Sequence, residues 1–491
     1  MQMTSQVSEI KVLQQDGTLK TVSQTHYRSH YGVMLNYPNI LGWTGSTAYT
    51  LKDANENNLE MISHWLAINR ANTLEEFQAA FQNFKGIPWV NAIYADDLGN
   101  SFYIDGTPVP NLSQEAQDAF KNKVDTDMFT SLLYGQGIVL LDGSDPMNEW
   151  QGTIRNGLMP YENAPKLTRL DFTANSNDSH WLTNPDEPLE GYSFLYGPEK
   201  TTRTLRTRMG LTFLEDSAGN DGLFSAADIK NALLSNRGML NELFLDDLID
   251  RCQAQGDSDV LLESGESIDI SYACNALSQW DGLVNTDSKG AHVFREFGSH
   301  FTENLFATPF DVNQPVATPS GLATAPATGE DPVLQCLALA VKDLTTAVIP
   351  VDAALGDIQF IVKNDVKIPC HSGKGSNGVF NMVRYSTWGT NRTLLPEEKP
   401  ENVINTKTGL YDEGYLINDG TSFAFALEFT DSGPKAQGIL TYSQSNNSES
   451  IHFDDQTKLF SQKQFRPMLF TDEEIQANIE SEITISAEVN Q

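Results

Sequence analysis

Residues 174–184 read Ala-Asn-Ser-Asn-Asp-Ser-His-Trp-Leu-Thr-Asn, and they are followed by Pro185, Gly191-Tyr-Ser193 and an arginine-rich run, Arg203-Thr-Leu-Arg-Thr-Arg208. Short polar side chains in this density are typical of a turn. The tripeptide Asn177-Asp-Ser179 also matches a glycosylation sequon, which occurs by chance in most chains of this length. Taken alone, the stretch predicts a turn, and only its neighbours along the chain make a functional interpretation stronger.

Further motifs flank this stretch on both sides, in a fixed order along the chain. They are Gly86-Ile-Pro-Trp-Val-Asn91, Ala95-Asp-Asp-Leu-Gly-Asn100, Trp150 with Gly152, Trp280-Asp-Gly282, Asn285-Thr-Asp-Ser-Lys-Gly290, Gly438-Ile-Leu440, Tyr442-Ser-Gln-Ser445, Ile451-His-Phe-Asp-Asp-Gln456 and Leu459-Phe460. In this order they resemble the penicillin acylase family of N-terminal-nucleophile (Ntn) hydrolases, most closely its long-chain branch, whose members act on acyl-homoserine lactones and aculeacin-type lipopeptides. The resemblance runs from about residue 10 to about residue 475.

The resemblance implies an α+β fold, the αββα layered sandwich of the Ntn hydrolases. Residues 1–491 would be the C-terminal portion of an acylase β chain, with a mostly helical segment at about 225–300 and without the strands that carry the nucleophile. Such a chain would expose strand edges and apolar surface, and we expect it to aggregate or to be partly molten when alone.

The resemblance also implies two site residues. The second Asn of the family's Asn-x-Asn-Asp/Asn-Ser segment donates to the oxyanion, and it corresponds to Asn177. An Arg further along supports the site, and Arg206 is the best match. Because the spacing differs by one residue, Arg203 and Arg208 remain alternatives. A neutral amide suits this role, since it donates directionally and does not titrate.

An Ntn hydrolase needs a Ser, Thr or Cys whose own α-amine acts as the base. In the family that Ser lies upstream of the region matched here, and Met1-Gln-Met-Thr-Ser5 offers no counterpart. The pairs Gly45-Ser46, Gly143-Ser144, Gly298-Ser299 and Gly375-Ser376 are interpreted as ordinary loop pairs.

By resemblance, then, the protein is an N-acyl amide hydrolase that removes a fatty-acyl group from an acyl-homoserine lactone or a related compound, a quorum-quenching type of activity. The expected partners are an upstream acylase segment, comprising the α chain and the N-terminal β part, and an N-acyl small-molecule substrate. The alternative is a catalytically inactive fragment or a binding protein on the same scaffold.

The composition argues against several other classes of protein. Lys and Arg total 32 against 65 Asp and Glu, and the net charge of −33 makes nucleic acid a poor partner. No apolar run is long enough for a membrane span, and the first residues do not form a secretory signal, whereas the family resemblance implies a periplasmic or secreted protein. No cofactor and no metal are expected, because His26 and His30 lie in a strand pattern without an acidic third ligand.

The four cysteines have no zinc-type spacing. Cys252 and Cys274 bracket a polar loop between two helical patterns, which suits a disulfide in an oxidising compartment equally well as two buried thiols.

Local patterns predict several elements. Asp16-Gly17 predicts a tight hairpin turn, and Asp96–Asn100 joins a second hairpin. One helical face is predicted from Leu59, Ile62, Trp65 and Leu66. The next helix should begin with a capping box formed by Thr73 and Glu76 and end at Gly86. Both helices should cover a sheet. Phe423, Phe425, Leu427 and Phe429 alternate with alanines, which predicts a strand covered on both faces.

Overall fold

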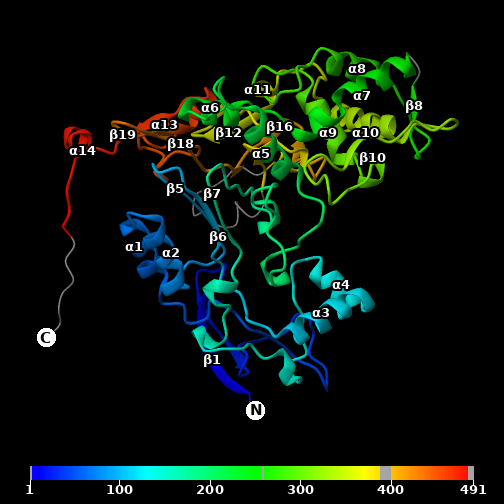
Figure 1. Cartoon of the computed structure of the whole chain (residues 1–491). Coiled ribbons are helices and arrows are strands. Elements are labelled where there is room, and N and C mark those ends of the chain that lie inside the picture. The colour runs from blue at the N-terminus through cyan, green and yellow to red at the C-terminus, as the bar shows by residue number, and fades with distance from the viewer. Residues whose placement is uncertain (1–2, 257–258, 387–399, 485–491) are drawn as a thin grey trace. The chain divides into compact units, whose positions relative to one another are not determined.

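The computed structural model describes residues 3–256, 259–386 and 400–484. The chain divides into two compact units (Figure 1). The first comprises Met1–Ala95, Asn100–Thr173 and Leu189–Gly197, and the second comprises Asp96–Gly99, Ala174–Pro188 and Pro198–Gln491. Each unit combines helices with sheets, which confirms the expected α+β class.

The described residues of the first unit form two sheets and four α-helices. Its strands are β1 (Thr4–Leu13), β2 (Leu19–Arg28), β3 (Val33–Leu35), β4 (Tyr49–Leu51), β5 (Asn91–Ala95), β6 (Ser101–Asp105) and β7 (Lys166–Arg169). Its helices are α1 (Met61–Arg70), α2 (Leu74–Asn83), α3 (Gln114–Thr126) and α4 (Met128–Tyr134). The sheets have the orders β1-β2-β3-β4 and β5-β6-β7, and all pairs in them are antiparallel.

Both predicted hairpins are confirmed. Strands β1 and β2 pair from Thr4 opposite Arg28 to Leu13 opposite Leu19, so the connection is a five-residue loop, longer than a tight turn. Gly17 has φ of 81°, a conformation that favours glycine, and Asp16 accepts a hydrogen bond from the Thr18 amide. Strands β5 and β6 form the second hairpin.

Helix α2 covers its sheet as predicted. Phe77 and Phe81 are buried, and Phe77 contacts the ring of Phe102 on β6 at 6.2 Å. Thr73 caps the first turn by accepting from the Glu76 amide, but the Glu76 carboxylate accepts from the amide of Asn72. The capping box is therefore only half formed. The helix also ends at Asn83, ahead of Gly86.

The predicted face of α1 is wrong. Ile62, Trp65 and Leu66 are 71%, 47% and 47% exposed, while the buried residue of this helix is His64. The ring of His64 lies 4.7 Å from that of Phe81, so α1 packs on α2 through its histidine. In the described residues of this unit, the apolar stripe of α1 consequently has no cover.

The second unit is built on a helical core. Its helices are α5 (Leu205–Asp216), α6 (Ala226–Leu234), α7 (Met239–Gln255), α8 (Ser271–Ser278), α9 (Ala291–His300), α10 (Pro332–Thr346), α11 (Leu355–Ile358), α13 (Asp455–Ser461) and α14 (Asp472–Asn478). Phe244 on α7, Phe294 and Phe297 on α9 and Leu337 on α10 meet in one hydrophobic cluster. Cys252 and Cys274 form a disulfide between α7 and α8, which decides between the two possibilities left open by the sequence.

Small sheets surround this core. Their strands are β8 (Val260–Leu261), β9 (Ser267–Ile268), β10 (Phe306–Thr308), β11 (Ser320–Leu322), β12 (Gln359–Lys363), β13 (Val366–Pro369), β14 (Val383–Arg384), β15 (Leu410–Tyr411), β16 (Gly414–Leu416), β17 (Asp419–Gly420), β18 (Phe423–Thr430), β19 (Gly433–Leu440) and β20 (Arg466–Met468). The largest has the order β13-β12-β16-β15, with β12 and β16 parallel, and another has the order β18-β19-β20.

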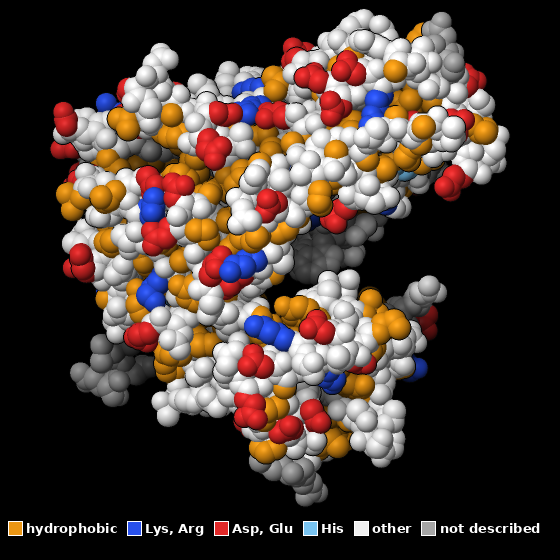
Figure 2. Space-filling model, turned by 45° about the vertical axis from the view of Figure 1, so that its right-hand side comes forward, with side chains coloured by type: hydrophobic (Ala, Val, Ile, Leu, Met, Phe, Trp, Pro, Cys, Tyr) orange, Lys and Arg blue, Asp and Glu red, His pale blue; other side chains and the backbone are white. Residues whose placement is uncertain are grey.

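Strand β18 forms where predicted, but only one of its faces is covered. Ala424 and Ala426 are buried, whereas Phe423 and Phe425 are each half exposed. These two rings stack on each other at 5.5 Å. The alternation of large and small side chains therefore separates an inner face of alanines from an exposed aromatic face. Figure 2 shows how widely hydrophobic side chains are spread over one side of the molecule.

Candidate functional site

The loop at Asn175–Ser179 presents Asn177 outward by local hydrogen bonds. The side chain of Asn175 accepts from the Asn177 amide at 2.8 Å and donates to the carbonyl oxygen of Asp178 at 3.0 Å. Asn177 itself has φ of 60°, a left-handed conformation that asparagine tolerates better than most residues. The turn composition noted in the sequence thus produces an exposed amide at the tip of the loop.

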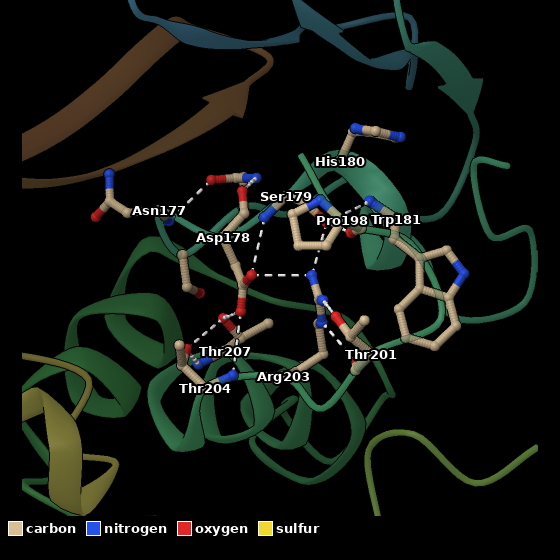
Figure 3. A network of polar contacts seen from close by, with 12 residues as sticks. Asn177, Asp178, Ser179, His180, Trp181, Pro198, Thr201, Arg203, Thr204 and Thr207 are labelled. Carbon is tan, nitrogen blue, oxygen red and sulfur yellow. Dashed lines mark hydrogen bonds and ion pairs between the residues drawn. The ribbon is translucent and has the colours of Figure 1, made fainter. Parts of the chain in front are cut away.

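Asp178 fastens this loop to the start of α5 (Figure 3). Its carboxylate accepts from Arg203 Nη1 at 2.9 Å, from the Thr204 amide at 3.1 Å and from Thr207 Oγ1 at 3.0 Å. Thr204 is the N-cap of α5, where a negative charge is also favoured by the helix dipole. One carboxylate therefore sets the position of the loop relative to the helix that carries Arg206.

Arg203 is a structural partner of this carboxylate. Its side chain is 1% exposed, donates to Ser179 Oγ at 2.6 Å and lies 5.3 Å from the centre of the Trp181 ring. Burial lowers the pKa of Arg203, and the charge of Asp178 opposes that shift. Because its side chain is almost completely buried by these contacts, Arg203 is not accessible to a substrate.

Arg206 contacts the candidate oxyanion donor directly. Its Nη2 donates to Asn177 Oδ1 at 2.6 Å and to the carbonyl oxygen of Ser176. Burial lowers the pKa of Arg206 as well, against the charge of Asp178. Because the amide oxygen of Asn177 faces the guanidinium, Nδ2 is turned away from it, and in the described part of the chain Nδ2 makes no hydrogen bond.

Arg208 points elsewhere. It is fully buried and donates from Nε to the carbonyl oxygen of Val316 at 2.6 Å and from Nη1 to that of Pro319 at 2.9 Å. Of the three arginines that the sequence left as candidates, the described structure thus brings only Arg206 to Asn177.

The sequence missed two further contributors to this arrangement. Asp178 was noted only as a turn residue, because its partners at Arg203 to Thr207 come together only once α5 forms. The second is Gly375, where a Cβ atom would lie 3.5 Å from Cδ of Arg206. The segment around Gly375 lies against the arginine stem although the two are far apart in sequence.

Of the four Gly-Ser pairs interpreted from the sequence as loops, two lie in bends or turns and two lie in helical segments. Gly45-Ser46 and Gly143-Ser144 lie in bends or turns, whereas Gly298-Ser299 is inside α9, where Ser299 Oγ donates to the Glu296 carbonyl. Gly375-Ser376 belongs to a 3-10 turn, η7 (Gly375–Asn377). The loop interpretation is therefore wrong for the last two pairs, whose spacing alone did not reveal the helical backbone.

No group of three or more His, Cys, Asp and Glu side chains in the described residues could hold a metal ion. In the same residues, no helix is long and apolar enough to cross a membrane.

Comparisons with known proteins show the family to which the chain belongs. The penicillin amidase family model matches residues 1–477, and the chain belongs to this family. It is 30% identical to an acyl-homoserine lactone acylase, PvdQ of Pseudomonas syringae pv. syringae (strain B728a), over 99% of this chain and 58% of that protein. It is 33% identical to aculeacin-A acylase of Actinoplanes utahensis, over 93% and 55% of the two chains. The chain thus spans little more than half the length of these curated relatives.

Among solved structures, the fold resembles a thermostable penicillin G acylase from Alcaligenes faecalis with a TM-score of 0.53 and 16% identity. The similarity covers 99% of this chain and 82% of the other. At that identity it supports the fold, and it agrees with the mixed helices and sheets described above.

Proposed function

We propose that this chain forms the oxyanion-binding part of an acylase that hydrolyses the amide bond of an N-acyl small molecule. The observation that carries the proposal is the contact between Arg206 Nη2 and Asn177 Oδ1, which leaves the two N–H groups of Nδ2 available at the surface of the loop. The similarity to acyl-homoserine lactone acylases and to aculeacin-A acylase favours a substrate with a long acyl chain.

The proposed chemistry is acyl transfer to a serine and then to water. A serine hydroxyl attacks the amide carbonyl carbon, the α-amine of that serine takes the hydroxyl proton, and the carbonyl oxygen becomes negative. Asn177 Nδ2 donates to this oxygen, and Arg206 prevents the amide from turning its oxygen toward the negative charge. Collapse of the tetrahedral intermediate expels the protonated amine, and water then releases the carboxylic acid.

In this proposal the serine is supplied by a separate segment, which is the chain's main partner. The support is the share of the relatives that the chain covers, together with the roles of Asn177 and Arg206, which assist a nucleophile without providing one. We also propose an exported, periplasmic or secreted protein. The Cys252–Cys274 disulfide supports this location, since such bonds persist in oxidising compartments.

The experiment compares the chain expressed alone with the chain expressed together with the preceding segment of a relative such as the PvdQ acylase. Hydrolysis of a chromogenic long-chain N-acyl amide is the readout, and Asn177→Gly in the combined protein is the control for the site. We expect activity only in the combination, and a large loss with the variant. If the combined proteins form a stable complex that binds the substrate but does not hydrolyse it, the chain is a binding protein on an acylase scaffold.

A further inference from the structure

The core of the second unit buries a guanidinium whose hydrogen bonding is incomplete. Arg295 on α9 is 5% exposed, and it donates from Nη1 to Gln359 Oε1 at 2.6 Å and from Nη2 to the Thr408 carbonyl oxygen at 2.6 Å. Its guanidinium also lies 4.0 Å from the centre of the Tyr415 ring. In the described part of the chain, Nε of Arg295 has no hydrogen-bond partner.

This cation also has no ion pair among the described residues. The adjacent carboxylate, Glu296, is bound by other groups: the Tyr415 hydroxyl at 2.7 Å, Asn405 Nδ2 at 2.7 Å and Thr408 Oγ1 at 3.0 Å. Burial raises the pKa of Glu296, and the hydrogen bond from Tyr415 and the charge of Arg295 oppose that shift. A buried cation is costly unless it is paired, and the carboxylate whose charge stabilises Arg295 is Glu296, which makes no direct ion pair with it. An anion at the free Nε would add to that stabilisation.

A small cavity lies beside Arg295. Its lining includes Arg295, Gln359, Ser372 and Lys374, and the space open to the centres of water-sized spheres is about 10 Å³. Ser372 is completely buried, and within the described residues its Oγ has no hydrogen-bond partner. The cavity thus has room for one particle of about the size of a water molecule, next to two donors without acceptors.

The electrostatics of the cavity favour an anion over a neutral molecule. Lys374 is the second cation in its lining, and its Nζ donates to the Lys407 carbonyl oxygen. Burial, assisted by the charge of Arg295, lowers the pKa of Lys374 to about 8. Positive charge is therefore concentrated around this cavity, in a chain whose net charge is −33.

We propose that this cavity binds one monatomic anion, chloride under ordinary conditions, between Nε of Arg295 and the hydroxyl group of Ser372. The small volume favours a single-atom ion over phosphate, sulfate and larger carboxylates. The anion would tie α9 to the segment that runs from Ser372 to Gly375, which lies against the stem of Arg206. This inference does not depend on the proposed acylase activity.

Crystals of the full chain grown in sodium bromide test the proposal, because bromide replaces chloride and scatters anomalously. We expect an anomalous peak within hydrogen-bonding distance of Arg295 Nε and Ser372 Oγ. Density at that position that refines as water without an anomalous signal would overturn the proposal, and so would an absence of density.

Thermal unfolding in solution gives a second, independent readout. In sodium chloride, the Tm of the wild type should rise with the logarithm of the chloride concentration, more steeply than in sodium acetate of equal concentration. Ser372→Ala should reduce the difference between the two salts, whereas Ser376→Ala, at an exposed position on the neighbouring turn, should preserve it. Equal behaviour of the two salts in the wild type contradicts chloride binding.

Discussion

Oδ1 of Asn177 accepts a hydrogen bond of 2.6 Å from Nη2 of Arg206, a residue 29 positions further along the chain. The same Nη2 also contacts the carbonyl oxygen of Ser176. An amide on an exposed loop would otherwise rotate freely. The guanidinium fixes which end of it faces outward, and in the proposed acylase this orientation presents Nδ2 as the donor.

Replacing Asn177 by Gly should remove the donor without straining the backbone, since Gly accepts a positive φ. In the combined acylase we expect kcat to fall about 10²–10³-fold, the usual effect of deleting one oxyanion donor. Stability should change by no more than about 0.5 kcal/mol because the side chain is exposed. Steady-state kinetics and urea unfolding provide the two measurements, and an unchanged kcat would contradict the assigned role.

Arg206→Gln should lower kcat through loss of amide orientation. If Arg206 acts through Asn177, the double variant with Asn177→Gly should be little worse than Asn177→Gly alone, so that the two effects are strongly non-additive. A sum of two independent effects would mean that Arg206 acts on the substrate by another route.

Asp178→Asn should destabilise the second unit. The change removes the charge that pairs with Arg203, whose side chain is 1% exposed, and leaves that cation buried without a counter-charge. We expect a loss of about 2–4 kcal/mol in urea unfolding. Glu413→Gln is the matched control, because its ion pair with Lys367 is largely exposed and should be worth less than about 1 kcal/mol. Equal effects of the two variants would argue against a clamp at Asp178.

Local sequence patterns predicted the elements whose determinants lie close together in the chain. The hairpin around Gly17, the helix capped by Thr73 and the strand from Phe423 were all found where expected. The assignment of Asn177 and Arg206 to one site was a prediction from family resemblance and not from local pattern, and the structure brings the two side chains into contact.

The sequence predictions that were wrong concern features that depend on contacts between distant segments. The amphipathic pattern of α1 did not indicate that His64 would pack on Phe81 and leave Trp65 exposed. Similarly, alternation in β18 could not show that the phenylalanines lack a cover. The sequence did not predict the hydrogen bonds of Asp178, because a carboxylate in a turn is usually solvated. Its partners at the start of α5 are close to it only in the folded chain.

Buried histidines should make the second unit sensitive to mild acid. Burial lowers the pKa values of His292 and His371 from 6.5 to about 4, so the folded state binds these protons less readily than the unfolded state. Stability should therefore be highest above pH 6.5 and fall toward pH 4, by about 1.4 kcal/mol per pH unit for each histidine at most.

His371→Gln keeps a donor for the Phe460 carbonyl oxygen, which His371 Nε2 contacts at 2.8 Å. This variant should flatten the pH dependence measured by urea unfolding at a series of pH values. A slope as steep as that of the wild type would show that His371 does not titrate on unfolding.

The thiols should respond differently to reagents. Burial raises the pKa of Cys336 to about 11 and that of Cys370 to about 12, so neither should react with a thiol reagent in the native protein. Reduction of Cys252–Cys274, or its replacement by two serines, should cost about 3 kcal/mol of stability. Thiol titration before and after unfolding checks the first expectation, and urea unfolding with and without reductant checks the second.

The most direct test of the acylase account is a crystal structure of the combined enzyme with a long-chain boronic acid, which forms a tetrahedral anion with a catalytic serine. The account predicts that Nδ2 of Asn177 lies about 2.7–3.1 Å from one anionic oxygen while Oδ1 still accepts from Arg206. A boronate oxygen held by other donors, with the Asn177 side chain in bulk solvent, would contradict it.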